Sequence, residues 1–170
     1  MTGCKVGLRR AALLLFTMLL AFPALADITG RARIVDGDTI EIRHQRIRLF
    51  GIDAPEARQF CTFDAKPWRC GQQATFALAE FIGKAWVHCE TVQQSGAASG
   101  DREGYTGITA VCYLGRKNVN AWLVRNGWAL DHGSKGTYSA EQIHAKRQRL
   151  GIWRGAFEMP WTWRPKPRRR

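Results

Sequence analysis

The stretch from Arg33 to Glu56 constrains the fold more than any other part of this sequence. It alternates apolar and polar side chains in short runs, which is typical of half-buried β-strands. The tripeptide Asp36-Gly37-Asp38 separates two of these runs and predicts a tight turn, because Asp-Gly tolerates the positive φ angles of hairpins. We therefore expect consecutive strands at residues 27–35, 39–42 and 46–52.

The third of these strands carries two arginines among its apolar residues. Ile47, Leu49 and Phe50 are expected to pack in the core, whereas Arg46 and Arg48 are expected to face away from it. Pro55 follows shortly afterwards and cannot continue a hydrogen-bonded ladder, so the strand must end before it.

The acidic residues at the ends of these strands carry the candidate chemistry. Asp38 begins the second strand and Asp53 ends the third, so neighbouring strands would bring the two carboxylates together. Such a pair repels unless a cation lies between its members, and oxygen ligands suit a hard ion such as Ca²⁺. Glu56 is placed to activate a water molecule, and Arg48 is placed to bind a phosphate. These are the groups that phosphodiester hydrolysis needs.

Two segments, Asp36-Gly-Asp-Thr39 and Arg48-Leu-Phe-Gly-Ile-Asp-Ala-Pro-Glu56, resemble the signature of the staphylococcal (thermo)nuclease-like family. The resemblance continues more loosely to about Trp153 and includes an Asn-x-x-Leu-Val pattern that begins at Asn120. It implies an α+β fold, a five-stranded OB-type Greek-key β-barrel with three helices. Barrels of this type commonly bind oligonucleotides across one face.

The resemblance also implies roles for individual residues. It implies that Asp38, Asp53 and the backbone carbonyl of Ala54 hold Ca²⁺. It implies that Glu56 acts as a base or positions the attacking water, and that Arg48 binds the phosphate. The implied activity is endonuclease-type cleavage of DNA or RNA at the 5′-side P–O bond, which leaves 3′-phosphate products.

Two positions depart from the family pattern. Tyr105 occupies the place of a second phosphate-binding arginine, and a phenol carries no positive charge at neutral pH. Loss of such a contact costs about 3–4 kcal/mol of transition-state stabilisation. Arg102 is a candidate replacement from the same loop. His132 lies where the family has nucleotide-stacking tyrosines, and is either a replacement platform for a base or a solvated loop residue.

Residues 1–26 have the pattern of a signal peptide, with basic residues, an apolar run and an Ala-x-Ala site at 24–26. The apolar run is shorter than the roughly 20 residues that a membrane span needs. We expect a monomeric nuclease-like domain at 27–163 and a basic tail at 164–170. The mature protein would be periplasmic or secreted, with no membrane attachment.

The charge of the chain favours polyanionic partners. The formal net charge is +12, and removing Lys5, Arg9 and Arg10 with the signal peptide leaves +9. Such an excess is compatible with nucleic acid, acidic polysaccharide or an anionic surface, and does not distinguish between them.

Four cysteines remain after removal of the signal peptide, and an even number in an exported chain favours two disulfides. We expect Cys61–Cys70, which bracket a short loop, and Cys89–Cys112, which lie in two strand-like runs. Zinc binding is disfavoured, because the sequence contains no Cys-x-x-Cys pair.

The remaining sequence predicts helices at residues 72–82, 119–126 and 139–150, and strands at 85–91 and 106–113. In the last helix, Ser139 and Gln142 predict a capping box, and Ile143 and Leu150 are expected to face the core. The aromatic segment that follows is expected to fold back onto the domain.

These patterns favour an exported, Ca²⁺-dependent phosphodiesterase whose rate is reduced by Tyr105. The alternative is a catalytically impaired OB-type module that binds nucleic acid or acidic polysaccharide.

Overall fold

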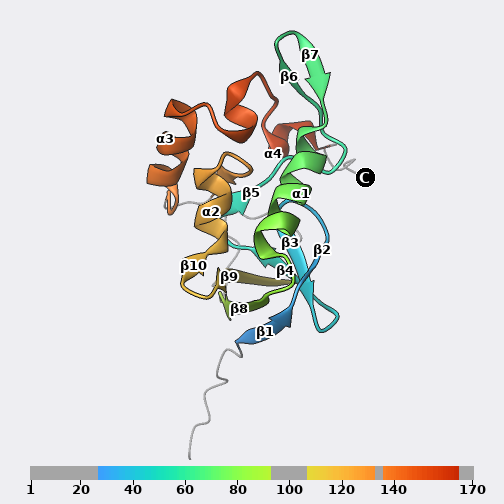
Figure 1. Cartoon of the computed structure of the whole chain (residues 1–170), viewed down its shortest axis with the longest axis vertical. Helices are drawn as coiled ribbons and strands as arrows, with labels where there is room; N and C mark the ends of the chain where they lie inside the picture. Colours follow the sequence, from blue (N-terminus) through green and yellow to red (C-terminus); the bar gives the residue numbers. More distant parts are fainter. Residues whose placement is uncertain (1–26, 93–106, 133–135, 165–170) are drawn as a thin grey trace, which may run out of the picture.

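The structure is a computed structural model, and it describes residues 27–92, 107–132 and 136–164. A curled β-sheet forms a barrel, and helices pack on one side of it (Figure 1). The strands are β1 (Ile28–Arg31), β2 (Arg33–Ile34), β3 (Thr39–Ile42), β4 (Gln45–Leu49), β5 (Ile52–Asp53), β6 (Cys61–Phe63), β7 (Lys66–Trp68), β8 (Trp86–Thr91), β9 (Ile108–Leu114), β10 (Lys117–Asn118) and β11 (Leu130–Asp131). The helices are α1 (Cys70–Ile82), α2 (Val119–Arg125), α3 (Ser139–Arg147), a 3₁₀ turn at Gly151–Arg154 and α4 (Pro160–Trp163).

The first strand closes the barrel. Its first part, β1, pairs antiparallel with β8, and its second part, β2, pairs antiparallel with β3. The order through the sheet is β1-β8-β9-β4-β3-β2, with β4 and β9 parallel. A Cβ on Gly30 would lie 2.6 Å from Cγ2 of Ile42, so a glycine is needed where the first strand approaches β3. The predicted α+β fold with a five-stranded OB-type barrel is confirmed.

The core lies between the barrel and helices α1 and α2. Many apolar side chains of the sheet and of these helices are fully buried, among them Ile40, Ile47, Leu49, Leu78 and Leu123. The two arms of the first strand and the parallel β4–β9 pair surround this core, so the barrel contributes most of the buried apolar surface that stabilises the fold.

Asn120 joins α2 to the barrel through its side chain. Its Nδ2 donates to the carbonyl oxygens of Phe50 and Ala110 at 2.9 and 3.3 Å, and its Oδ1 accepts from the backbone N–H of Cys112 at 3.1 Å. The side chain is fully buried, so these bonds satisfy polar groups that would otherwise be costly. This explains the asparagine at the start of the Asn-x-x-Leu-Val pattern.

Both predicted disulfides are present. Cys89 and Cys112 face each other on the antiparallel strands β8 and β9, with their Cα atoms 4.1 Å apart. Cys61 and Cys70 join β6 to the start of α1, with their Cα atoms 5.6 Å apart. The segment between Cys61 and Cys70 is not a plain loop, because it contains the hairpin of β6 and β7.

The turn at Gly37 is explained by packing, not by a positive φ angle as predicted. Gly37 has no positive φ, whereas Arg43 and His44 have φ angles of 51° and 64° in the next turn. A Cβ on Gly37 would lie 2.8 Å from the Cβ of Ala54, so the buried site has no room for a side chain.

The helix predicted at residues 139–150 is present, but its predicted end, cap and buried residues are wrong. Helix α3 ends at Arg147, and its N-cap is Tyr138, so Ser139 does not cap it. The side chain of Gln142 instead accepts a hydrogen bond from the backbone N–H of Asp131, which ties α3 to β11. Ile143 is 49% exposed, and the small Ala145 is the buried residue of this helix. Leu150 lies beyond its end.

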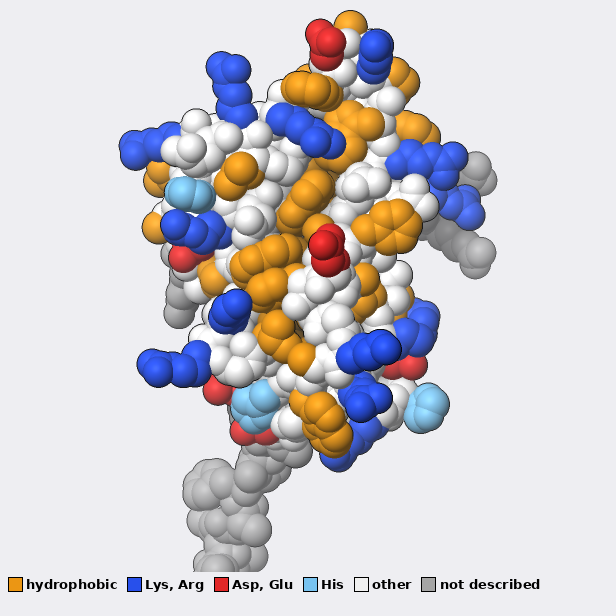
Figure 2. Space-filling model, viewed as in Figure 1, with side chains coloured by type: hydrophobic (Ala, Val, Ile, Leu, Met, Phe, Trp, Pro, Cys, Tyr) orange, Lys and Arg blue, Asp and Glu red, His pale blue; other side chains and the backbone are white. Residues whose placement is uncertain are grey.

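Figure 2 shows where charge lies on the face that carries α1 and α2. Hydrophobic side chains run down the middle of this face, and lysines and arginines are scattered around its edges. The net positive charge is therefore not gathered into one patch here.

None of the helices in the described part of the chain has the length and apolar character that a membrane span requires.

Candidate active site

Asp38, Arg48 and Asp53 meet where β3 begins and β4 ends. Cross-strand pairing places Thr39 opposite Arg48, so Asp38, which precedes Thr39, lies beside the arginine. One guanidinium nitrogen of Arg48, Nη2, lies 3.2 Å from Oδ1 of Asp53 and 3.6 Å from Oδ2 of Asp38. The predicted convergence of the two aspartates on one point is therefore present in the structure.

The prediction that Arg48 faces away from the interior is wrong. Its side chain is 2% exposed, because the two buried carboxylates provide the charge that compensates it. Two of its nitrogens, Nε and Nη1, are buried and have no hydrogen-bond partner among the described residues. Buried donors without partners are costly, so these two nitrogens lack the acceptors that such groups usually have. Arg46, by contrast, is exposed as predicted.

Glu56 is held by a loop that packs against the start of α1. The buried side chain of Gln59 accepts a hydrogen bond from the backbone N–H of Glu56 at 3.1 Å. A Cβ on Gly71 would lie 1.7 Å from the carbonyl oxygen of Glu56, so the helix approaches this loop too closely for any other residue. The backbone that carries the candidate base is thus fixed from two sides.

Arg164 enters the site from the C-terminal segment. Its Nη1 donates to Oδ1 of Asp53 at 3.0 Å and to Oε1 of Glu56 at 2.7 Å, and its Nη2 donates to Oδ2 of Asp53 at 2.7 Å. Burial opposes the charge of Arg164, but the hydrogen bonds to Asp53 and Glu56 raise its pKa above the usual value. The guanidinium therefore stays charged between the two carboxylates.

The sequence pattern places Arg164 in a basic tail and does not predict its position in the site. The row of aromatic residues before Arg164 was a signal for this position, because that segment was expected to fold back onto the domain. Trp161 stacks on His132 with ring centroids 4.7 Å apart, and Phe157 packs edge-on against Trp153. The residue that follows this folded segment is carried into the site with it.

The donor set at this end of the barrel fits a hard cation. Asp38 and Asp53 supply carboxylate oxygens, and Ala54, whose carbonyl is the third predicted ligand, is buried next to Asp53. The four cysteines of the described residues are in disulfides, so no thiolate competes. Among the described residues, no group of three or more His, Cys, Asp or Glu side chains could hold a metal ion. Two carboxylates and a carbonyl are an oxygen set that suits Ca²⁺.

Three other site residues were predicted, namely Arg102, Tyr105 and His132. Arg102 and Tyr105 fall in the stretch 93–106, outside the described residues. His132 is half-buried and lies under the ring of Trp161, and its backbone N–H donates to the carbonyl of Gly51. Trp161 therefore already occupies the ring face on which a base was expected to stack.

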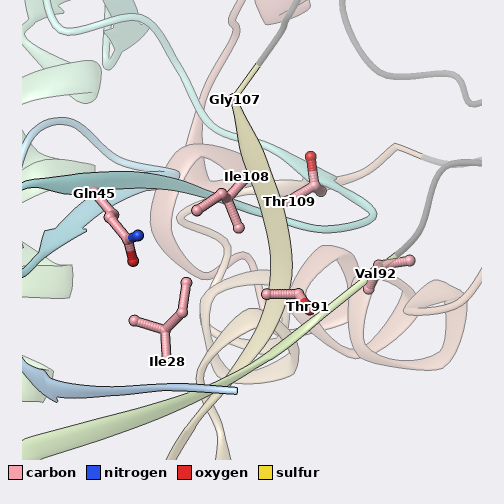
Figure 3. A pocket seen from close by; sticks show the side chains of 7 residues that line it. All are labelled: Ile28, Gln45, Thr91, Val92, Gly107, Ile108 and Thr109. Carbon is pink, nitrogen blue, oxygen red and sulfur yellow. The ribbon is translucent and has the colours of Figure 1, made fainter. Parts of the chain in front are cut away.

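A separate hollow of about 380 Å³ lies between β1, β4, β8 and β9 (Figure 3). Its lining residues are Ile28, Gln45, Thr91, Val92, Gly107, Ile108 and Thr109. None of these side chains is charged, so the hollow lacks the carboxylates and arginines on which the predicted chemistry depends. The candidate chemistry is therefore placed in the carboxylate and arginine cluster instead.

The structure combines an OB-type barrel with two converging aspartates, a glutamate on the next loop and a buried arginine. This combination is the kind expected in an enzyme that acts on phosphate esters. Residues 46–155 match the family described as Staphylococcal nuclease homologue. The chain belongs to this family.

Similar proteins agree with this assignment. A protein from Rhizobium meliloti named "Succinoglycan biosynthesis protein ExoI" is 35% identical over 79% of this chain and 69% of its own length. A "Micrococcal nuclease" from Shigella flexneri is 33% identical over 91% of each chain. An "Uncharacterized endonuclease" from Escherichia coli is 30% identical over 88% of this chain and 94% of its own. The family and the names of the last two proteins support a nuclease.

Proposed function

We propose that this protein is an exported, Ca²⁺-dependent endonuclease that hydrolyses phosphodiester bonds of DNA or RNA. The observation that carries the proposal is the environment of Arg48. Its guanidinium is buried against two carboxylates, and it keeps two N–H groups without a partner among the described residues. A phosphate is the ligand whose oxygens satisfy such donors beside a cation site.

Each residue of the cluster has a task in this reaction. Asp38, Asp53 and the carbonyl of Ala54 would hold Ca²⁺, which when bound supplies positive charge that neutralises the phosphate. Glu56 takes a proton from a water molecule, and the water oxygen forms a bond to phosphorus. The bond from phosphorus to the 5′ oxygen breaks, and that oxygen takes up a proton from solvent. The products are a 3′-phosphate and a 5′-hydroxyl.

Arg48 stabilises the charge that builds on the phosphate during this step. Its free Nε and Nη1 groups donate to the non-bridging oxygens, and burial strengthens these bonds because water does not screen them. Tyr105 brings no second charge, so the rate is reduced unless another cation takes that part.

Export is supported by the two disulfides, because such bonds persist in oxidising compartments. We place the mature protein in the periplasm or outside the cell, as a monomer that begins near residue 27.

The test is hydrolysis of single-stranded DNA and RNA by residues 27–170, with Ca²⁺ and with excess chelator, beside Glu56→Gln. We expect chelator to stop cleavage and Glu56→Gln to lower it about 10³-fold, since a general base contributes roughly 10²–10⁴. Absence of cleavage above the Glu56→Gln background, in protein with native circular dichroism, would contradict the proposal. Salt-sensitive, chelator-insensitive binding to DNA or acidic polysaccharide would then identify the non-catalytic module.

A further inference from the structure

We propose that Arg164 is a second phosphate-binding catalytic residue, which leaves Asp53 and Glu56 for the phosphate when substrate binds. This inference rests on the proposed nuclease function. It assigns a role to a residue of the C-terminal segment that lies 111 positions from Asp53 along the chain.

The position of the Arg164 guanidinium is the first observation that supports this role. Arg164 lies within 2.7–3.0 Å of carboxylate oxygens on both Asp53 and Glu56. A phosphate that binds between the metal ligands and the base must therefore pass within reach of it. The planar fork of a guanidinium fits carboxylate and phosphate oxygens equally well, so one side chain can exchange between the two partners.

The balance of charge in the site is the second observation that supports this role. Asp38, Asp53 and Glu56 bring three carboxylates into the site, and a phosphodiester adds a further negative charge that grows in the transition state. Arg48 already gives one nitrogen to Asp38 and Asp53, which leaves it two groups for the substrate. Arg164 is the second arginine that the described residues place at this point.

The exchange would also release Glu56 from its contact with Arg164. While Arg164 donates to Glu56, one oxygen of this carboxylate, Oε1, is engaged with the guanidinium. Transfer of the guanidinium to the substrate phosphate removes this contact together with the two bonds that Arg164 makes to Asp53. Substrate binding and the release of Glu56 and Asp53 from Arg164 would then be coupled through one side chain.

The segment that carries Arg164 is fixed before substrate arrives. The carbonyl oxygen of Glu158 accepts a hydrogen bond from Nε2 of Gln59 at 2.6 Å, and Gln59 also holds the backbone of Glu56. Pro160 is buried at the start of α4, and Trp161 stacks on His132. Such positioning reduces the ordering cost of bringing a charge to the phosphate.

The experiment compares the unmodified protein with Arg164→Gln and Arg164→Lys, and with Arg154→Gln as a matched control. Arg154 lies over the ring of Trp68, 4.0 Å from its centroid, and has no part in the cluster. Three quantities are measured: kcat and KM on single-stranded DNA at saturating Ca²⁺, Ca²⁺ affinity by calorimetry, and affinity for a nucleoside 3′,5′-bisphosphate.

We expect Arg164→Gln to lower kcat about 100-fold, as for removal of one transition-state donor. Its affinity for the bisphosphate should fall about tenfold, while its Ca²⁺ affinity stays equal or rises because Asp53 loses a competing partner. Arg164→Lys should recover part of both losses, since it keeps the charge but not the fork. Arg154→Gln should change none of them.

An unchanged or higher kcat for Arg164→Gln would overturn the inference, because Arg164 would then serve only as a counter-ion of the carboxylates. If the unmodified protein cleaves nothing, the proposed function fails, and bisphosphate affinity alone decides on Arg164. Equal bisphosphate affinity in Arg164→Gln and the unmodified protein would overturn the phosphate-binding role in either case.

Discussion

The candidate active site has two halves, and they are held in place by different means. The barrel half consists of Asp38, Arg48 and Asp53, which are at most 3% exposed in their side chains and lie on or beside paired strands. The C-terminal half consists of residues 156–164, and its Arg164 side chain is 20% exposed. Burial and strand pairing fix the first half, whereas ring stacking and a few hydrogen bonds fix the second. Changes in the barrel half should therefore alter stability, and changes in the C-terminal half should alter catalysis with little cost in stability.

The largest expected effect tests the barrel half. Arg48→Met leaves two buried carboxylates without one of their compensating charges, and breaking a buried pair in this way costs about 3–5 kcal/mol. We expect the free energy of unfolding to fall by about 3 kcal/mol, as measured by urea denaturation with chelator present. Arg46→Met, an exposed change on the same strand, should stay within about 0.5 kcal/mol. Equal stabilities of the two variants would show that Arg48 is not held as an ion pair.

A smaller effect is expected where the two halves meet, at the start of α1. An alanine usually stabilises a helix relative to glycine by about 0.5–1 kcal/mol. At Gly71, however, the new Cβ would lie 1.7 Å from the carbonyl oxygen of Glu56. We expect Gly71→Ala to reverse the usual sign and lower the free energy of unfolding by about 2 kcal/mol, with loss of cleavage because Glu56 moves. Gln73→Ala in the same helix is the control, and a stabilised, fully active Gly71→Ala would contradict the packing.

The smallest effect on stability is expected in the C-terminal half. Trp161→Ala removes the ring that stacks on His132 and loosens the segment that carries Arg164. We expect a cost of about 1 kcal/mol or less in thermal denaturation, but about a tenfold loss of kcat. Trp86→Ala changes an exposed tryptophan on β8 and should leave kcat unaltered. A large loss of stability in Trp161→Ala would remove the distinction between the two halves.

The same difference decides what could be predicted from the sequence. The barrel strands follow from local alternation, and the adjacency of Asp38 and Asp53 follows from their places at strand ends. The burial of Arg48 does not follow from the sequence. Alternation shows which residues point away from the apolar core, but it does not show whether their side chains then meet solvent or buried polar groups. The contact of Arg164 with Asp53 is set by tertiary docking, and no local periodicity records it.

The details of α3 show a related limit. A serine followed three residues later by a glutamine is a recognised start signal for a helix. Here the side chain of Gln142 binds Asp131 on β11, so a tertiary contact takes the group that local capping would use. Likewise, Gly37 is small because Ala54 lies opposite it, which is a consequence of packing and not of turn geometry.

Closure of the barrel by the first strand also bears on how the protein behaves at high concentration. An open sheet edge presents unpaired N–H and C=O groups on which another chain can assemble. In the described residues, β1 and β2 bond to β8 and to β3, and a bridge between Thr62 and Ala156 covers one side of the β6–β7 hairpin. Within this described part of the chain, the first strand therefore leaves no open edge on the main sheet, and we expect little edge-to-edge aggregation through that sheet.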